Sequence, residues 1–211
     1  NMAFILPILE EHKSSGLDLH ISAADVTDFD SCASMIQQIE ADHGPIDILV
    51  NCAGITRDKT LKRMTPDQWN AVIDTNLNSA FNVTQQIVNG MTERGFGRII
   101  NISSVNGQRG QFGQANYAAA KAGLHGFTMS VAQETAAKGV TVNTVSPGYV
   151  ETAMTSAMPE QVLESIVAAV PVGRMGKPAE IAFAVSWLAD ERNAYTTGAN
   201  IPVNGGMYMS A

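Results

Sequence analysis

The sequence has few positive charges, few cysteines and no long apolar run, and each shortage excludes a class of protein. The 13 Lys and Arg against 20 Asp and Glu give a net charge of −7, which argues against a nucleic-acid partner. An acidic chain can still hold a phosphorylated ligand in one local pocket. The two cysteines, Cys32 and Cys52, form no CxxC pair, so we expect no metal site and two reduced thiols in a cytoplasmic protein.

No run is long enough to span a bilayer, so we expect no membrane partner. The opening "NMAFILPILEEH" has no basic flank and no small-residue cleavage site, which favours an amphipathic helix over a signal peptide. With 211 residues, 45% of them apolar and 16% charged, the composition is typical of a globular protein. Residues 1–211 are predicted to form a single domain, because no linker, repeat or low-complexity tract interrupts them.

Strand-like apolar runs alternate with longer helical patterns along the chain. This alternation predicts an α/β fold, a Rossmann-like doubly wound parallel sheet with helices on both faces. The segment at about 66–94 could be one bent helix or two. The expected strands are 17–22, 46–51, 97–103, 140–146 and 199–204, and the expected helices are about 30–43, 66–94, 115–138 and 178–190.

The loops that follow four of these strands are rich in Gly, Asn, Ser, Thr or Asp. They read "AADVTD", "NCAGITRD", "SVNGQRGQFGQ" and "PGYVETAM". Parallel sheets bind ligands at the carboxyl ends of their strands, and any one of these loops could still be an ordinary turn. Four in succession favour a ligand site at this edge.

Tyr117 and Lys121 are spaced so that a helix places them on one face. An ammonium group near a phenol favours the phenolate and lowers its pKa, which would make the pair a proton donor and acceptor. Ser104 ends the preceding strand, and its hydroxyl could polarise a carbonyl group. The four histidines are scattered outside the loops, so no Ser–His–Asp arrangement is indicated.

Several motifs together resemble the short-chain dehydrogenase/reductase family over about residues 25–206. They are "NCAG", "NISS", "YAAAK", "VNTVSPGYVET" and "PVGRMGKPAEIA…WLAD…TGANIPVNGG". Within the family, "NAGITRD"-like and "GQFGQANY" stretches closely resemble acetoacetyl-CoA reductases, with 3-oxoacyl-ACP reductases as the nearest rival. The resemblance implies NADPH-dependent reduction of acetoacetyl-CoA to (R)-3-hydroxybutyryl-CoA, supplying polyhydroxyalkanoate synthesis.

The resemblance also implies a role for each matching residue. Tyr117 would be the catalytic acid, and Lys121 would lower its pKa and bind the nicotinamide ribose. Ser104 would hold the substrate carbonyl, and Asn76 would position a water that relays protons to Lys121. The implied cofactor contacts are Tyr117, Lys121, Asp25, Val26, Asn51, Ala53, Gly54, Pro147, Gly148, Val150 and Thr152, and the implied substrate contacts are Ser104, Asp58, Gln111, Phe112, Gln114 and Tyr149.

The sequence lacks the Gly-rich loop and the first strands with which the family begins. About 35 residues of the family pattern are missing, judged from the length of a βαβ unit. We therefore expect these 211 residues alone to bind NADPH weakly or not at all and to be prone to aggregate. We further expect them either to pair 17–22 directly with 46–51 or to leave 17–22 unanchored. A non-catalytic interaction remnant is the alternative in another class, although the complete Ser, Tyr and Lys set favours an enzyme. The alanine-rich helix at 115–138 implies, through the family, a homotetramer.

Overall fold

The computed structural model describes residues 16–152, 155 and 159–209. Its sheet has four strands in the order β1-β2-β3-β4, and every neighbouring pair is parallel. The strands are β1 (Ile48–Asn51), β2 (Gly97–Ile102), β3 (Val140–Pro147) and β4 (Asn200–Val203). These four confirm the strands expected near 46–51, 97–103, 140–146 and 199–204.

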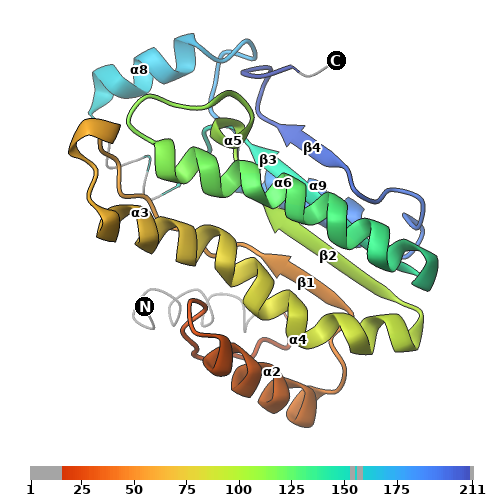
Figure 1. Cartoon of the computed structure of the whole chain (residues 1–211). Coiled ribbons are helices and arrows are strands. Elements are labelled where there is room, and N and C mark those ends of the chain that lie inside the picture. Colours follow the sequence, from red (N-terminus) through yellow and green to blue (C-terminus); the bar gives the residue numbers. More distant parts are fainter. Residues whose placement is uncertain (1–15, 153–154, 156–158, 210–211) are drawn as a thin grey trace.

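Helices cover both faces of the sheet, which confirms the predicted doubly wound architecture (Figure 1). One face carries α4 (Ser79–Arg94) and α6 (Ala115–Thr135), and the other carries α9 (Pro178–Ala189). Helix α2 (Phe29–His43) packs on α4. The remaining elements are the helices α3 (Pro66–Ile73), α5 (Val105–Arg109) and α8 (Glu160–Ala168) and the 3₁₀ turns η1 (Leu61–Arg63) and η3 (Ala136–Lys138). Sequence patterns did not predict α5 or α8.

The core is divided by the sheet into two clusters. The larger one fills the space between the sheet and the helices α2, α4 and α6, and it includes Ile36, Ile87 and Ile99. The smaller one, formed by Ile100, Val145 and Leu188, lies under α9. Strands β2 and β3 are therefore buried on both faces, as continuous apolar strands in a parallel sheet should be.

Local signals set the helix boundaries. Thr65 caps α3 in a reciprocal arrangement with Gln68, and Pro66 occupies the first turn, where its missing N–H costs nothing. The helical stretch at 66–94 is continuous but contains a π-helical turn, η2 (Asp74–Asn78), between α3 and α4. It ends at Gly95, whose φ of 71° is the left-handed conformation that glycine adopts without strain.

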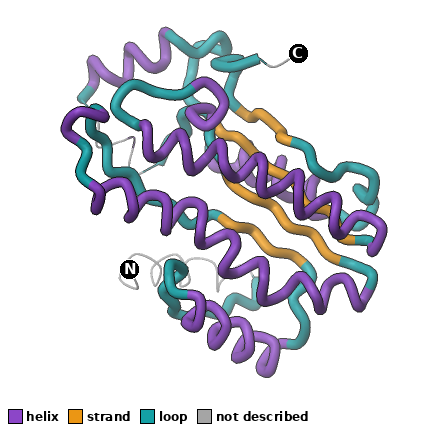
Figure 2. The backbone as a smooth tube through the Cα atoms, in the orientation of Figure 1, coloured by secondary structure: helices purple, strands orange, loops and turns teal. Residues whose placement is uncertain are grey.

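The strand predicted at 17–22 is wrong. These residues run as an irregular segment, and Leu17 and Leu19 are 57% and 40% exposed. Strand geometry needs a neighbouring strand to satisfy backbone N–H and C=O groups. Among the described residues β1 pairs only with β2, and 17–22 pairs with neither (Figure 2). Of the two arrangements expected, the structure has the unpaired one. The helix expected at the start of the chain lies outside the described residues.

A row of polar side chains crosses the sheet beneath α4 and α6. Asn51 donates to Thr84 at 3.2 Å and to Asn101 at 2.9 Å, and Asn101 donates to Thr128 at 2.8 Å. Thr128 in turn shares a 2.7 Å hydrogen bond with Thr144. Asn101 and Thr144 are fully buried, so these bonds replace the water that the groups lose on folding. The row ties α4 and α6 to three successive strands.

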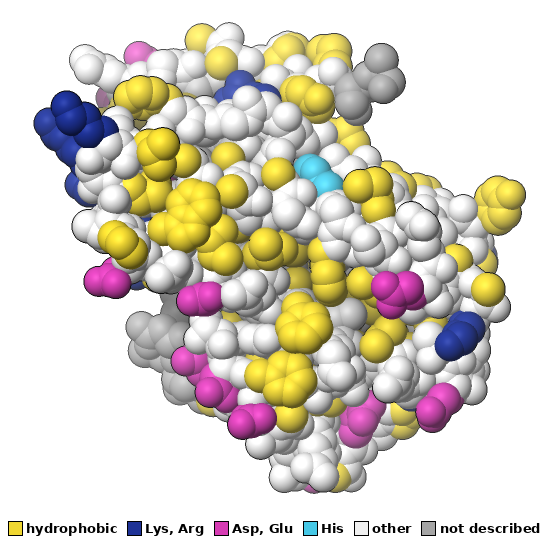
Figure 3. All heavy atoms as spheres, viewed as in Figure 1, with side chains coloured by type: hydrophobic (Ala, Val, Ile, Leu, Met, Phe, Trp, Pro, Cys, Tyr) yellow, Lys and Arg dark blue, Asp and Glu magenta, His cyan; other side chains and the backbone are white. Residues whose placement is uncertain are grey.

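The outer surface of the helices on this face carries exposed apolar side chains (Figure 3). Phe81 on α4 and Met129 on α6 are each 50% exposed, and Trp69 on α3 is 37% exposed. No helix in the described ranges is long and apolar enough to cross a bilayer.

Candidate active site

Lys121 lies in a buried position at the carboxyl end of β2. Its side chain is 4% exposed, and its Nζ donates to the carbonyl oxygen of Ile102 at 2.7 Å. Burial lowers the pKa of Lys121 to about 8, and the nearby Cys52 partly opposes this change. A Cβ added at Gly54 would lie 3.6 Å from this Nζ. The "NCAG" turn therefore closes over the lysine.

Tyr117 shares a face of α6 with Lys121, as the spacing predicted. Lys121 Nζ lies 5.8 Å from the centre of the Tyr117 ring. Burial raises the pKa of Tyr117, a hydrogen bond from Ser104 partly offsets the rise, and the charges of Asp58, Cys52 and Tyr149 add to it. The net shift is upward because the loss of water outweighs the effect of an ammonium that points to Ile102, and the part of Lys121 in lowering this pKa stays a prediction.

Ser104 is held at the start of α5, where it caps the helix. Its Oγ accepts a hydrogen bond from the backbone N–H of Asn106 at 3.1 Å. An oxygen that accepts from the backbone keeps its own proton available, and the hydroxyl lies close enough to Tyr117 to lower the pKa of that phenol. The preceding Ser103 donates to the carbonyl oxygen of Lys121 at 2.7 Å, which fastens α6 to the end of β2.

Asn76 lies in the π-helical turn η2 and is 2% exposed. Its Oδ1 accepts from the backbone N–H of Ile55 at 2.8 Å, and its Nδ2 donates to the carbonyl oxygen of the same residue at 2.9 Å. A Cβ at Gly54 would lie 3.7 Å from this Oδ1. Asn76 therefore clamps the backbone that follows "NCAG" beside Lys121. Its side chain is committed to this clamp, and the water relay stays a prediction.

Two predicted substrate residues meet directly beside Tyr117. Gln114 donates to the carboxylate of Asp58 at 2.8 Å and accepts from Asn106 at 2.9 Å. These bonds link the 110–114 loop to Asn106, whose backbone N–H is capped by Ser104. Tyr149 is close enough to Tyr117 to influence its pKa. By contrast, Gln111 and Phe112 lie on the exposed rim, with Phe112 86% exposed.

These side chains combine a phenol, an ammonium and a hydroxyl group at one edge of a parallel sheet. The arrangement can donate a hydrogen bond and a proton to a carbonyl oxygen. A family model described as enoyl-(acyl carrier protein) reductase matches residues 8–208. The chain is 64% identical over 196 residues to an acetoacetyl-CoA reductase of Allochromatium vinosum, covering 93% of this chain and 80% of that protein. The chain belongs to the short-chain dehydrogenase/reductase family.

Membership in this family makes the protein an oxidoreductase with a nicotinamide cofactor. An acetoacetyl-CoA reductase of Cupriavidus necator is 55% identical, over 95% of this chain and 82% of that protein. A 3-oxoacyl-[acyl-carrier-protein] reductase of Salmonella typhimurium is 52% identical, over 87% of this chain and 75% of that protein.

Three residues that the family resemblance assigned to the cofactor line one hollow. It has a volume of about 190 Å³, and its lining includes Val26, Asn51, Ala53 and the exposed Cys52. The side chain of Asn51 points into the polar row beneath the helices. Asp25 is exposed beside the hollow, and its carboxylate accepts hydrogen bonds from the backbone and hydroxyl of Thr27 at 2.9 and 2.7 Å.

The predicted cofactor loop after β3 is fixed by two other segments. Gly148 donates to the carbonyl oxygen of Val203 at 3.0 Å, and a Cβ there would lie 2.9 Å from the Cα of Asn204. Only glycine fits this approach of two backbones. Val150 forms an isolated parallel bridge with Gly176. The remaining two members, Pro147 and Thr152, lie at the end of β3 and in the turn beyond it.

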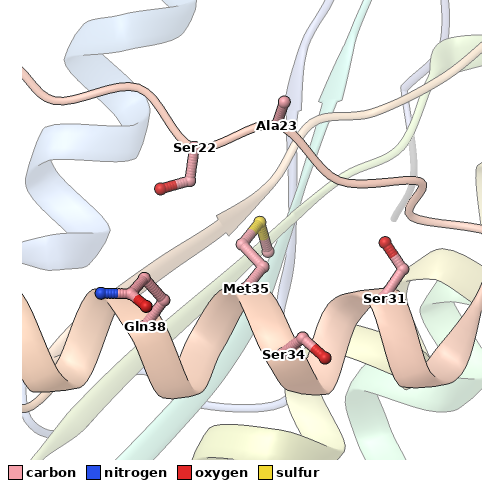
Figure 4. A pocket seen from close by; sticks show the side chains of 6 residues that line it. All are labelled: Ser22, Ala23, Ser31, Ser34, Met35 and Gln38. Carbon is pink, nitrogen blue, oxygen red and sulfur yellow. The ribbon is translucent and has the colours of Figure 1, made fainter.

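Another hollow, of about 380 Å³, separates the irregular segment at Ser22 and Ala23 from α2. Figure 4 shows Met35 on α2 pointing toward that segment, with Ser31, Ser34 and Gln38 along the same helix. Its lining shares with the first hollow only Met35 and includes none of the catalytic residues. We assign it no role in the reaction.

Sequence reasoning missed the residues that support the site. Ser103, Asn106 and Gly107 lie within the "NISS" and "SVNGQRGQFGQ" motifs, but the sequence predicts no role in the site for them. A Cβ at Gly107 would lie 2.8 Å from the backbone carbon of Lys121, so this glycine lets α5 pack directly on α6. The motifs contain these residues, but their contacts could not be predicted from sequence, because each contact joins segments that are separate along the chain.

Proposed function

We propose that this protein reduces acetoacetyl-CoA to (R)-3-hydroxybutyryl-CoA with NADPH as the cofactor, and that the product supplies polyhydroxyalkanoate synthesis. The observation that carries the proposal is the grouping of the buried Ser104 and Lys121 with the half-buried Tyr117, beside the Asp58–Gln114 pair. The names of the relatives that are 64% and 55% identical support the same substrate.

The residues at the strand ends fit a nicotinamide nucleotide. Gly54 leaves room above Lys121, Gly148 brings the loop after β3 against Asn204, and the hollow by Val26 and Ala53 offers an apolar wall. When bound, the nucleotide supplies a hydride to the substrate carbonyl carbon. We propose that Lys121 and Tyr117 contact its ribose, and that Pro147, Gly148, Val150 and Thr152 flank its nicotinamide.

Reduction of a ketone also consumes one proton, and Tyr117 is placed to give it. Its raised pKa keeps the phenol protonated at neutral pH, which suits an acid in the reducing direction. Ser104 donates a hydrogen bond to the same carbonyl oxygen and so stabilises the charge that develops there. The ammonium of Lys121 then stabilises the phenolate that remains, and its pKa of about 8 lets it return a proton.

We propose that the acyl thioester lies along the 110–114 loop. The Gln114 and Tyr149 side chains can hydrogen-bond thioester or amide groups, and the exposed Phe112 ring can pack on the acyl chain. Gln111 and Asp58 would complete the polar lining. Asn76 keeps the opposite wall in place through Ile55.

The second candidate is the reduction of a 3-oxoacyl group on acyl carrier protein, which the 52% identical Salmonella relative supports. The test compares kcat/KM for acetoacetyl-CoA and for the acetoacetyl carrier protein, each with NADPH and NADH. A preference for the CoA thioester and for NADPH is expected. A strong preference for the carrier protein would overturn the CoA assignment, and absence of turnover on both would favour the non-catalytic alternative.

We also propose that the protein is a cytoplasmic homotetramer. The free thiols of Cys32 and Cys52 suit a reducing compartment. The exposed face of α6 carries small residues, Ala119, Ala122 and Gly126, which would let a second copy of this helix approach closely. The exposed Phe183 and Trp187 on α9, at 77% and 46%, would supply a second interface. Sedimentation that shows a stable monomer at micromolar concentration would contradict this assembly.

A further inference from the structure

Five exposed cations gather beside the active site of this acidic protein. We call them the basic rim: Arg57, Lys59, Lys62, Arg63 and Arg109. Four of them fall within residues 57–63, where Asp58 is the single acidic residue, in a chain whose net charge is −7. Figure 3 shows Lys and Arg side chains gathered at the upper left, near the segment that leads into α3 in Figure 1.

None of the five is neutralised by a carboxylate in the described part of the chain. The ion pairs of Arg94, Arg174 and Arg192 with acidic side chains lie elsewhere. Among the described residues, the side-chain hydrogen bonds of the basic rim go to neutral oxygens only. Arg57 donates to the carbonyl oxygen of Thr56 at 2.9 Å, and Arg109 donates to the side-chain oxygen of Gln111 at 3.4 Å. The positive charge is therefore available to an anion.

The basic rim is joined to the loop that we assign to the substrate. The backbone N–H of Lys59 donates to the carbonyl oxygen of Gly113 at 2.9 Å. The adjacent Asp58 accepts from Gln114 at 2.8 Å, and Gln114 is the N-cap residue of α6, three residues before Tyr117. The rim thus borders the same opening in which the thioester would react.

Exposed apolar groups accompany the charges. Leu61, between Lys59 and Lys62, is 72% exposed, and Phe112 on the neighbouring loop is 86% exposed. These two side chains place apolar surface directly beside the positive charges. The surface is therefore suited to a ligand that has both apolar parts and several anionic groups.

We propose that the basic rim binds the phosphate groups of the 3′-phospho-ADP part of coenzyme A, so that the nucleotide end of the thioester is held outside the catalytic opening. The inference rests on the proposed function. A phosphomonoester carries about −1.5 to −2 charges at neutral pH, and the adjoining diphosphate adds more. Arginine forks bind phosphate oxygens in pairs, while lysines add point charges.

The rim suits a small polyanion better than a carrier protein. A stable protein interface buries about 800 Å² on each partner, whereas these cations occupy one short segment and one neighbouring helix end. Coenzyme A places several phosphate charges within the reach of such a segment. An acidic carrier protein is therefore an outcome of the test.

The test measures CoA binding by calorimetry on the full-length protein and on matched variants. Lys62→Glu together with Arg63→Glu should weaken CoA binding by roughly tenfold at low salt, since two exposed ionic contacts are reversed. The milder Lys62→Gln/Arg63→Gln pair should weaken it by roughly threefold. Lys138→Glu changes an exposed lysine in η3, just beyond α6, and gives the control for a single charge reversal away from the rim. Dephospho-CoA should bind the wild-type protein more weakly than CoA does.

Kinetics on two substrates separate this inference from the proposed function. The KM for acetoacetyl-CoA should rise in the rim variants relative to the KM for acetoacetyl-N-acetylcysteamine, which has no phosphate. If the protein turned over neither thioester, the proposed function would be overturned. The CoA titration would still test whether the basic rim binds CoA. If CoA binding were unchanged in the rim variants, or were weakened equally by Lys138→Glu, the assignment of the basic rim to the CoA phosphates would be overturned. Weakened binding of the carrier protein alone would assign the rim to a protein partner.

Discussion

The middle of the sheet and its β1 edge differ in how firmly they hold their side chains. Ile99, Ile100 and Val145 in the paired strands β2 and β3 are at most 1% exposed. On β1, which among the described residues has one neighbouring strand, Ile48 and Val50 are 47% and 39% exposed. The proton-transfer groups lie at the buried middle of the sheet (the firm part), and the hollow assigned to the nucleotide lies at the exposed β1 edge (the open part). Groups that need exact geometry are thus attached where the backbone is best supported.

The largest expected effect tests the firm part. Tyr117→Phe keeps the ring and its packing but removes the proton donor. General acid catalysis is worth roughly 10²–10⁴-fold, so kcat for ketone reduction should fall by that order while the melting temperature stays close to that of the wild type. Steady-state kinetics and thermal unfolding measure the two quantities. Near-normal turnover in this variant would show that another group supplies the proton.

The pH dependence tests the ionisation of Lys121. Its pKa of about 8 predicts that ketone reduction falls by up to about tenfold per pH unit above that value, as the ammonium loses its proton. Between about pH 8 and 10.5 the unfolded chain binds this proton more tightly than the folded chain does. The contribution of this residue to the free energy of unfolding therefore rises with pH over that window.

Lys121→Met should remove both effects. The measurements are a pH–rate profile and urea unfolding at several pH values, in wild type and variant. A rate that shows no inflection between pH 7 and 9 in the wild type would mean that the lysine does not limit the proton supply.

A smaller effect is expected from the packing of α5 on α6. In Gly107→Ala the new methyl group would meet the backbone of Lys121 at 2.8 Å. Overpacking of this kind costs about 1–3 kcal/mol in the free energy of unfolding. In Gly126→Ala, on the exposed face of α6, the new methyl group meets nothing within 4 Å in one chain. It should stabilise the protein by about 0.5–1 kcal/mol, because alanine is the better helix former. Denaturant unfolding of both variants measures these changes in the free energy of unfolding. Equal changes in the two variants would contradict the close packing of α5 on α6.

The smallest effect is expected at the open part. Leu19→Ser changes a side chain that is 40% exposed in an unpaired segment, so the free energy of unfolding should change by less than about 0.5 kcal/mol. Ile99→Ala, in the middle of β2, should cost about 2–5 kcal/mol. If Leu19→Ser proved as damaging as Ile99→Ala, the contrast between the two parts of the sheet would not hold.

The sequence predicted the features that depend on local residue patterns, such as buried strands and helical spacing. The buried strands β2 and β3 were readable from their Ile and Val residues, and the Tyr117–Lys121 register followed from the helical repeat. The strand at 17–22 had the same apolar character, but a strand is defined by its neighbour, which the composition of the segment does not specify. Helix α5 was hidden in a loop-like sequence because its start depends on the Ser104 cap.

The electrostatics of the site could not be read from sequence for the same reason. The spacing of Tyr117 and Lys121 predicted a lowered tyrosine pKa, whereas burial, to which distant segments contribute, sets the net direction in the folded chain. Arg98 is another example, since it is 2% exposed within β2 and donates to backbone carbonyl groups at Gly139 and Glu191. Its partners lie far along the chain, and nothing in the strand itself identifies them.

The polar row beneath α4 and α6 also acts as a key for strand alignment. Asn51, Asn101 and Thr144 are exact register partners across β1, β2 and β3. Sliding a strand by two residues would keep apolar side chains facing the core, so hydrophobic burial alone would discriminate poorly against that error. It would, however, leave buried amide and hydroxyl groups without partners, at about 1–3 kcal/mol for each. The row therefore widens the energy gap between the native pairing and its nearest misaligned competitors during folding, and the carboxyl ends of the strands, with the catalytic groups they carry, reach the same edge together.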